Sequence, residues 1–242
     1  MPGSDLKFHQ KLLPNQPEYS NHFKGADVAA ALFERICASS GIKDARDELA
    51  LELPANFSVE DQASNPVSLR FLQILFRLAG VKRVLEIGSF IGISAIYFAK
   101  ALPADGEVVT IEKFDYFAGI ARRNFARTGF EKKIKLIEGD AFEVIDSLRG
   151  QKFDVVFIDG NKERYKDYFI AAEGLVAPRG IVLVDDCFFH GDALNDKPTT
   201  EKGRGVRAFL DYAATRNDWL RVALPLANGI MVMIRDEAPT TA

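Results

Sequence analysis

The chain contains few of the residues that disulfide scaffolds and zinc clusters require. Among its 242 residues only Cys37 and Cys187 are cysteines, no CxxC pair occurs, and there are only three histidines. The sequence therefore indicates neither a disulfide framework nor a zinc cluster. Two free thiols suit a reducing compartment.

Long apolar runs and a surplus of basic charge are also lacking. No uncharged apolar segment reaches the ~18 residues that a membrane-spanning helix needs, and the first ten residues have no signal-peptide core. The 31 Lys and Arg residues against 34 Asp and Glu residues give a net charge of −3, which offers no electrostatic basis for binding nucleic acid. We therefore expect a soluble, cytoplasmic protein that binds neither membranes nor nucleic acid.

The length suits one α/β domain with an N-terminal extension. We expect an N-terminal arm and helices over residues 1–60 and the main domain over 61–242. Residues 27–40 have helical spacing. A further helix is predicted to follow Asn65-Pro66 and to end at Gly80.

From residue 83 onward, short apolar runs alternate with amphipathic segments. Strands are predicted at 83–88, 107–112, 133–140, 153–160 and 180–186, and helices at 93–102, 116–129, 141–149 and 163–176. Continuous Val, Ile and Leu runs are typical of strands that are buried on both faces. The alternation predicts a Rossmann-like α/β fold with a doubly wound, mostly parallel sheet. Two last β-like runs meet at Asn228-Gly229, which predicts a terminal antiparallel hairpin.

Acidic residues stand at the end of five consecutive predicted strands. In an open parallel sheet, ligands bind beyond the carboxyl ends of the strands. One acid there is commonplace, but solvation alone does not explain five. The strand ends carry, in order, Glu86 with Gly88, Glu112, Asp140, Asp159, and Asp185 with Asp186.

The first two strand ends indicate a nucleoside site. The turn from Gly88 to Gly92 lacks the third glycine of a dinucleotide fingerprint, so a pyrophosphate cradle fits poorly. Glu112 lies 20 residues beyond Gly92, where an acid can accept hydrogen bonds from both ribose hydroxyls. Asp140 can either reach an adenine amino group or cap the following helix.

The last two strand ends indicate a cation site. Asp159, Asp185 and Asp186 would lie on one rim, where their mutual repulsion favours a compensating cation, and carboxylates are the ligands that Mg²⁺ prefers. Alternatively, these acids cap helices or pair with Arg164 and Arg179. Lys162 can act as a base only if its pKa falls; otherwise it is a surface lysine.

These motifs resemble a known family. Residues 64–235 are similar to the class I cation-dependent O-methyltransferases, which include the caffeoyl-CoA and catechol O-methyltransferases. The resemblance rests on six segments taken in order, which are Val84–Ser94, Thr110–Glu112, Glu138–Ala141, Phe157–Asp159, Val184–Asp186 and Asn228–Ile230. It implies a seven-stranded sheet whose last strand pair is antiparallel.

The resemblance also implies roles for individual residues. The expected S-adenosylmethionine contacts are Glu86, Gly88, Ser94, Glu112, Asp140 and Ala141. Asp159, Asp185 and Asp186 are expected to bind a divalent cation, Mg²⁺ foremost and Mn²⁺ or Ca²⁺ next, and Lys162 and Asp159 to be catalytic. The resemblance further implies a homodimer whose N-terminal helices close over the substrate pocket. One position departs, because Asp186 stands where the family usually has asparagine.

We therefore expect a metal-assisted O-methyltransferase that acts on a small catechol-like substrate. The alternatives are a metal-independent methyltransferase, a non-catalytic S-adenosylmethionine-binding protein and an NAD-dependent oxidoreductase. The polar loop 191–203 is expected to overhang the pocket. Its basic residues can attract an acidic or CoA-linked substrate, nearby phenylalanines can stack on a planar ring, and His190 is either a substrate contact or a solvated loop residue. The residues concerned are Lys197, Lys202, Arg204, Arg207, Phe188 and Phe189.

Overall fold

The computed structural model describes residues 35–43, 48–55 and 63–236, and the chain divides into two units at residues 1–43 and 44–242. In the first unit residues 35–39 are helical. They form the end of the helix expected at 27–40, and the rest of that helix and the expected N-terminal arm lie outside the described residues. The second unit contains the predicted sheet.

That sheet has seven strands in the order β3-β2-β1-β4-β5-β7-β6. Strands β1 to β5 are parallel, and β7 runs antiparallel to both of its neighbours. The fold is therefore the predicted Rossmann-like one, with its topological switch between β1 and β4. The strands are β1 (Arg83–Ile87), β2 (Glu107–Glu112), β3 (Ile134–Glu138), β4 (Phe153–Ile158), β5 (Val176–Val184), β6 (Trp219–Leu224) and β7 (Ile230–Arg235).

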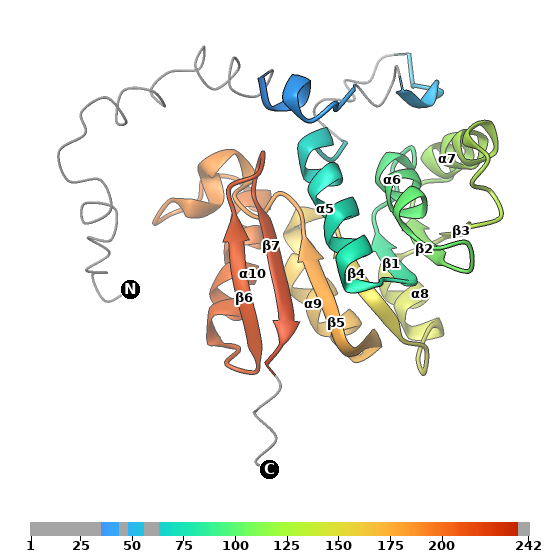
Figure 1. Cartoon of the computed structure of the whole chain (residues 1–242). Coiled ribbons are helices and arrows are strands. Elements are labelled where there is room, and N and C mark those ends of the chain that lie inside the picture. The colour runs from blue at the N-terminus through green and yellow to red at the C-terminus, as the bar shows by residue number, and fades with distance from the viewer. Residues whose placement is uncertain (1–34, 44–47, 56–62, 237–242) are drawn as a thin grey trace. The chain divides into compact units, whose positions relative to one another are not determined.

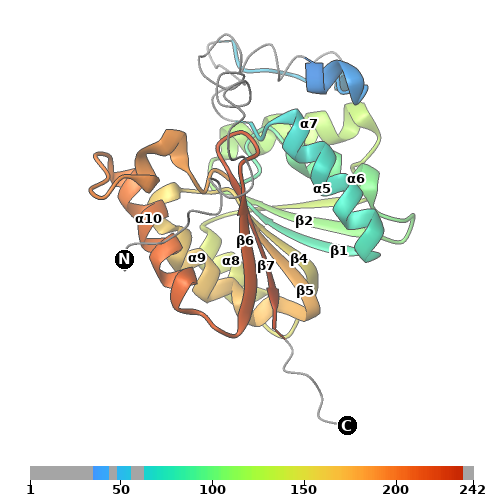
Figure 2. The same ribbon diagram turned by 60° about the vertical axis from the view of Figure 1, so that its left-hand side comes forward.

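Helices cover both faces of the sheet (Figures 1 and 2). One face packs against α5 (Pro66–Ala79), α6 (Ile93–Ala101) and α7 (Asp115–Thr128), and the other against α8 (Ala141–Ser147), α9 (Tyr165–Ala172) and α10 (Glu201–Thr215). In the central strands β1, β2, β4 and β5, alternate residues supply the two cores, as the period of two requires. In β4, for example, Phe157 faces Phe98 of α6, whereas Ile158 belongs to the core that contains Phe169 of α9.

Local signals set the ends of α5 and of the terminal hairpin. The Asn65 side chain accepts a hydrogen bond from the Val67 backbone N–H at 2.9 Å, and Gly80 ends the helix with φ 65°. Between β6 and β7 the turn ends at Gly229, whose φ of 89° suits glycine. Both predictions are confirmed. In the described part of the chain, no helix has the length and hydrophobicity needed to cross a bilayer.

The region between β4 and β5 differs from the prediction. The helix expected at 163–176 is divided into a 3-10 turn at Lys162–Arg164, α9, and a second 3-10 turn at Glu173–Leu175. Strand β5 then begins at Val176, four residues earlier than expected. Pro178 explains the early end of the helix, because proline lacks an N–H and its ring clashes with the preceding helical turn. The chain therefore becomes extended before Gly180.

Candidate active site

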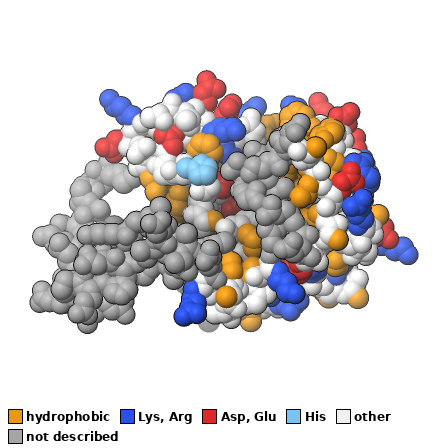
Figure 3. Space-filling view, turned by 90° about the horizontal axis from the view of Figure 1, so that it is seen from above, with side chains coloured by type: hydrophobic (Ala, Val, Ile, Leu, Met, Phe, Trp, Pro, Cys, Tyr) orange, Lys and Arg blue, Asp and Glu red, His pale blue; other side chains and the backbone are white. Residues whose placement is uncertain are grey.

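A cavity of about 480 Å³ lies at the carboxyl ends of the parallel strands. Its walls come from the turns after β1, β2, β3 and β4 and from the loop after β5. Seen from above, the described part of this surface carries charged side chains of both signs around its edges, with hydrophobic side chains between them (Figure 3). Of the predicted site residues, the cavity is lined by Gly88, Ser94, Glu112, Asp140, Ala141, Asp159, Lys162 and Asp186.

The turn after β1 packs against the ends of both neighbouring strands, β2 and β4. Gly88 and Ser89 both donate their backbone N–H to the carbonyl oxygen of Ile111 in β2, each at 3.0 Å. Gly88 has φ 101°, and a Cβ added there would collide with the backbone carbonyl of Asp159. Only glycine permits this approach. The requirement for Gly88 therefore comes from the packing of β1 against the end of β4.

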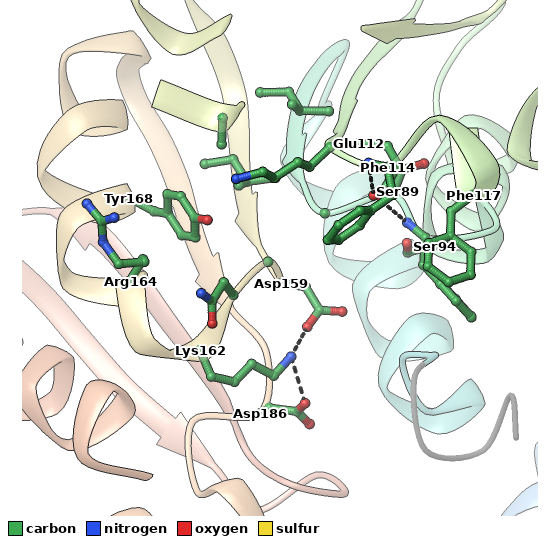
Figure 4. Close-up of a pocket in the computed structure, with 18 of the residues that line it drawn as sticks. Ser89, Ser94, Glu112, Phe114, Phe117, Asp159, Lys162, Arg164, Tyr168 and Asp186 are labelled. Carbon is green, nitrogen blue, oxygen red and sulfur yellow. Dashed lines mark hydrogen bonds and ion pairs between the residues drawn. The ribbon is translucent and has the colours of Figure 1, made fainter. Parts of the chain in front are cut away.

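Glu112 ends β2 and is held by backbone amides. Its two carboxylate oxygens accept hydrogen bonds from the Phe90 N–H at 2.8 Å and the Phe114 N–H at 2.9 Å. The residue is only 7% exposed, and this burial raises the pKa of its carboxyl group above the usual value. Each carboxylate oxygen can accept a second hydrogen bond. Glu112 therefore presents oriented acceptors to the cavity (Figure 4).

Glu86 lies inside β1 rather than at its end, and it does not line the cavity. Its side chain is fully buried, one oxygen accepts a hydrogen bond from the Thr110 hydroxyl, and the other has no hydrogen-bond partner among the residues that the structure describes. Burial raises the pKa of Glu86 to about 8, although the Ser94 and Thr110 hydroxyls oppose the shift. Burial therefore favours the protonated form of Glu86, which supports the cavity wall from behind.

Asp140 has the capping role that the sequence left open, and it also faces the cavity. One carboxylate oxygen accepts a hydrogen bond from the Phe142 backbone N–H at 3.0 Å, at the start of α8. The other lies 3.1 Å from the Lys113 ammonium. The Phe142 N–H and then Lys113 lower the pKa of Asp140. An adenine contact by Asp140 stays a prediction.

At the other end of the cavity, Lys162 lies between two carboxylates (Figure 4). Its ammonium is 2.6 Å from an oxygen of Asp159, which follows β4, and 2.9 Å from an oxygen of Asp186, which follows β5. The Ser64 hydroxyl donates to the second oxygen of Asp159 at 3.3 Å. With 16% of its side chain exposed, Lys162 is not the surface lysine of the alternative interpretation.

The charges in this cluster are not balanced. Asp185 is 4% exposed and lies behind the cavity wall, where one of its oxygens accepts the Asp186 backbone N–H at 3.0 Å. Burial and then the neighbouring carboxylates raise the pKa of Asp185. Burial also raises the pKa of Asp159, which Lys162 opposes. Three carboxyl groups therefore lie near one ammonium. Burial alone would lower the pKa of Lys162, but Asp159 and Asp186 help to raise it.

The expected alternative pairing with arginine is wrong. The Arg164 guanidinium lies 2.7 Å from Asp167, three residues along the chain. Arg179 has no ion pair with any residue in the described part of the chain. Neither arginine neutralises the acids at the strand ends.

Comparison with known proteins identifies the family. The sequence model of the O-methyltransferase family matches residues 51–236. The chain belongs to the O-methyltransferase family. A catechol O-methyltransferase from Niastella koreensis is 32% identical over 148 residues, which cover 60% of this chain and 67% of that enzyme. Caffeoyl-CoA O-methyltransferase 2 from Zea mays is 32% identical over 179 residues, which cover 69% and 67% of the two chains.

The solved structure of another family member identifies the methyl donor. The O-methyltransferase TomG from Streptomyces achromogenes, in complex with S-adenosylmethionine, superposes with a TM-score of 0.71 at 29% identity. The superposition covers 83% of this chain and 94% of TomG. The present chain is thus an S-adenosylmethionine-dependent O-methyltransferase. A nucleoside cofactor suits the oriented Glu112 carboxylate and the glycine turn described above.

A divalent cation suits the donor chemistry of this O-methyltransferase but not its present side-chain arrangement. Asp159, Asp185 and Asp186 offer hard oxygen ligands and carry more negative charge than Lys162 offsets. Over residues 35–43, 48–55 and 63–236, however, no three His, Cys, Asp or Glu side chains are placed to hold a metal ion together. Lys162 occupies the position between two of the three candidate ligands.

Only some of the candidate substrate residues in the loop after β5 line the cavity. Phe189, His190 and Lys202 line the cavity, and His190 is exposed. Phe188 does not line it and packs against the hairpin turn at Gly229. The aromatic and basic wall of the cavity therefore consists of fewer residues than the sequence suggested.

The remaining basic residues of that region have other partners or lie elsewhere. Arg204 donates to the backbone carbonyl oxygen of Thr199 at 3.0 Å, and Arg207 lies 2.8 Å from Asp211. Lys197 does not line the cavity. The loop itself is fastened by Asp192, whose two oxygens accept hydrogen bonds from the backbone and side chains of Thr199 and Thr200.

Several lining residues were not predicted from the sequence. Phe90 and Phe117 pack together with ring centroids 4.8 Å apart, beside Glu112. Tyr168 stacks on Phe142 at 5.0 Å on the opposite wall. In the sequence Phe117, Phe142 and Tyr168 are indistinguishable from core residues of helices, and Phe90 is one residue of the glycine turn. Their approach to the cavity depends on tertiary packing. The only sequence feature that could have indicated a site role for Ser64 is its position just before Asn65, the N-cap of α5.

Proposed function

We propose that this enzyme transfers the S-adenosylmethionine methyl group to one hydroxyl of a small aromatic substrate with two vicinal hydroxyls, and that a divalent cation assists it. The observation that carries the proposal is that one cavity connects Glu112 with the cluster of Asp159, Lys162 and Asp186. A methyl donor held at the first end would place its methyl group toward an acceptor at the second. Such orientation can contribute ~7–11 kcal/mol to catalysis.

The cofactor end is assigned as follows. Glu112 accepts hydrogen bonds from the ribose hydroxyls, and Asp140 with Ala141 contacts the adenine. Gly88 lines the cavity and lets the turn after β1 pack against the Asp159 backbone, which holds this wall where the cofactor would bind. Ser94 lines the cavity in front of Glu86, so Ser94 contacts the amino acid portion of the cofactor and Glu86 supports Ser94 from behind.

At the acceptor end, the residues of the chain supply charge and orientation. Asp159, Asp185 and Asp186 would hold the divalent cation, which when bound acts as a Lewis acid and a template for two adjacent oxygens. Lys162 has a raised pKa, which favours an ammonium that stabilises the phenolate over a neutral lysine that removes its proton. Phe189 offers an aromatic surface for the substrate ring.

The substrate class is supported by the relatives and by the cavity wall. The relatives named above are a catechol and a caffeoyl-CoA O-methyltransferase. Lys202 and His190 add basic groups to the lining, which favours a dihydroxy aromatic that carries an acid group. The family resemblance extends the proposal to a homodimer, which light scattering on the purified protein would measure.

A product analysis tests the substrate assignment. The purified enzyme would be incubated with S-adenosylmethionine and with catechol, 3,4-dihydroxybenzoate, caffeoyl-CoA or 3-hydroxybenzoate, and the products identified by mass spectrometry. We expect one methyl group on the vicinal diols and none on 3-hydroxybenzoate. Equal methylation of 3-hydroxybenzoate would contradict the requirement for two adjacent hydroxyls.

A further inference from the structure

The position of Lys162 has a consequence for cation binding. Its ammonium contacts one oxygen of Asp159 and one oxygen of Asp186, at 2.6 and 2.9 Å. The three side chains are 16%, 12% and 29% exposed, so solvent screens these ion pairs only in part. The two carboxylates are thus occupied by a cation that belongs to the protein.

The Lys162 ammonium and a divalent cation would compete for the same two oxygens. Mg²⁺ binds carboxylate oxygens at about 2.0–2.1 Å and demands near-octahedral geometry. A divalent cation placed between Asp159 and Asp186 would occupy the space of the Lys162 ammonium, and the two positive charges would repel each other strongly in a partly buried site.

We propose that Lys162 competes with the divalent cation for Asp159 and Asp186, so that the cation binds only when the ammonium withdraws from them. The proposal rests on the cation of the proposed function. It also gives a role to the unusual Asp186. A carboxylate there pairs with the ammonium, whereas the uncharged amide usual in the family would offer only a neutral acceptor.

The competition makes a measurable prediction about metal affinity without substrate. Removing the ammonium frees both carboxylates and removes a repelling charge, so Lys162→Met should bind Mn²⁺ about tenfold more tightly or better, which corresponds to about 1.4 kcal/mol. Lys162→Arg keeps the charge and should resemble the wild type. Lys166→Met is the matched control, because Lys166 lies on α9, is exposed, and faces the Tyr212 ring of α10 instead of the acidic cluster.

The experiment is a titration of each full-length variant with Mn²⁺, in which the free ion is followed by electron paramagnetic resonance. Circular dichroism and calorimetric binding of S-adenosylmethionine would show that each variant is folded. The expected order is Lys162→Met tightest, with the wild type, Lys162→Arg and Lys166→Met together and weaker.

Three results would overturn the proposal. Equal Mn²⁺ affinity in the wild type and Lys162→Met would remove the competition but leave the cation of the proposed function in place. Tight binding by Lys162→Arg would show that the charge is not the cause. Absence of Mn²⁺ binding in every variant would refute both the competition and the proposed cation site. An assay of methyl transfer in the presence of chelator would then show whether the enzyme is active without a cation.

Discussion

Replacing Glu112 by glutamine removes one negative charge while it keeps the length and shape of the side chain. In the wild type both carboxylate oxygens accept backbone N–H groups, from Phe90 at 2.8 Å and from Phe114 at 2.9 Å. An amide can accept only one of these two hydrogen bonds, because its NH₂ group is a donor. In Glu112→Gln the side-chain NH₂ group therefore faces one of these two backbone N–H groups, which loses its acceptor. The uncharged amide is also a weaker acceptor for the ribose hydroxyls.

The magnitude follows from these lost hydrogen bonds. A hydrogen bond to a charged group contributes about 1.5–3 kcal/mol. Loss of one such bond to the ribose would weaken S-adenosylmethionine binding about 10-fold to 150-fold. The buried N–H left without an acceptor would lower the free energy of unfolding by about 1–3 kcal/mol. Glu112→Gln should therefore lower both cofactor affinity and stability.

The assay is calorimetric titration with S-adenosylmethionine, together with urea denaturation. Asp115→Asn is the matched control, because Asp115 is also acidic, is exposed, and does not line the cavity. We expect the control to bind the cofactor like the wild type. An unchanged dissociation constant in Glu112→Gln would refute the assignment of Glu112 to the ribose.

Three further substitutions test other parts of the site. Asp159→Ala should abolish turnover with nearly unchanged calorimetric binding of S-adenosylmethionine, and wild-type turnover would contradict the assignment. Glu86 has a folded pKa of about 8, raised from an unfolded value near 4.3, so the stability of the wild type relative to Glu86→Gln should fall by up to about 5 kcal/mol as the pH rises through that interval. A constant difference in urea denaturation would argue against this. Gly88→Ala should lower the melting temperature more than Gly150→Ala. Both glycines have positive φ, but of the two only Gly88 faces a backbone carbonyl. Equal losses would show that the backbone strain of positive φ acts alone.

Much of the fold could be predicted because each strand carries its own signal. The Val and Ile runs predicted strands that the structure confirms as β2 at 107–112 and β4 at 153–158. Asn228-Gly229 predicted the hairpin turn, which lies between β6 and β7. Strand β5 was less predictable. It begins with Val-Ala-Pro-Arg-Gly, in which Arg179 has φ 62° and the register against β4 shifts, so the local sequence resembles a turn.

The candidate site was predictable in outline but not in depth. Counting acids at strand ends found Glu112, Asp159 and Asp186, which line the cavity. The same count could not show that Glu86 and Asp185 are buried behind its wall, because that depends on the exact strand end and on the alternation of side chains. The ion pair between Lys162 and Asp186 joins residues 24 positions apart along the chain, which only the packing of β4 beside β5 brings together.

The most direct test of the proposed mechanism is methyl transfer from labelled S-adenosylmethionine to a catechol, first with excess chelator and then with a divalent cation restored. We expect chelator to abolish transfer and Mg²⁺ or Mn²⁺ to restore it. Full activity in chelator would contradict the role proposed for a cation at Asp159, Asp185 and Asp186.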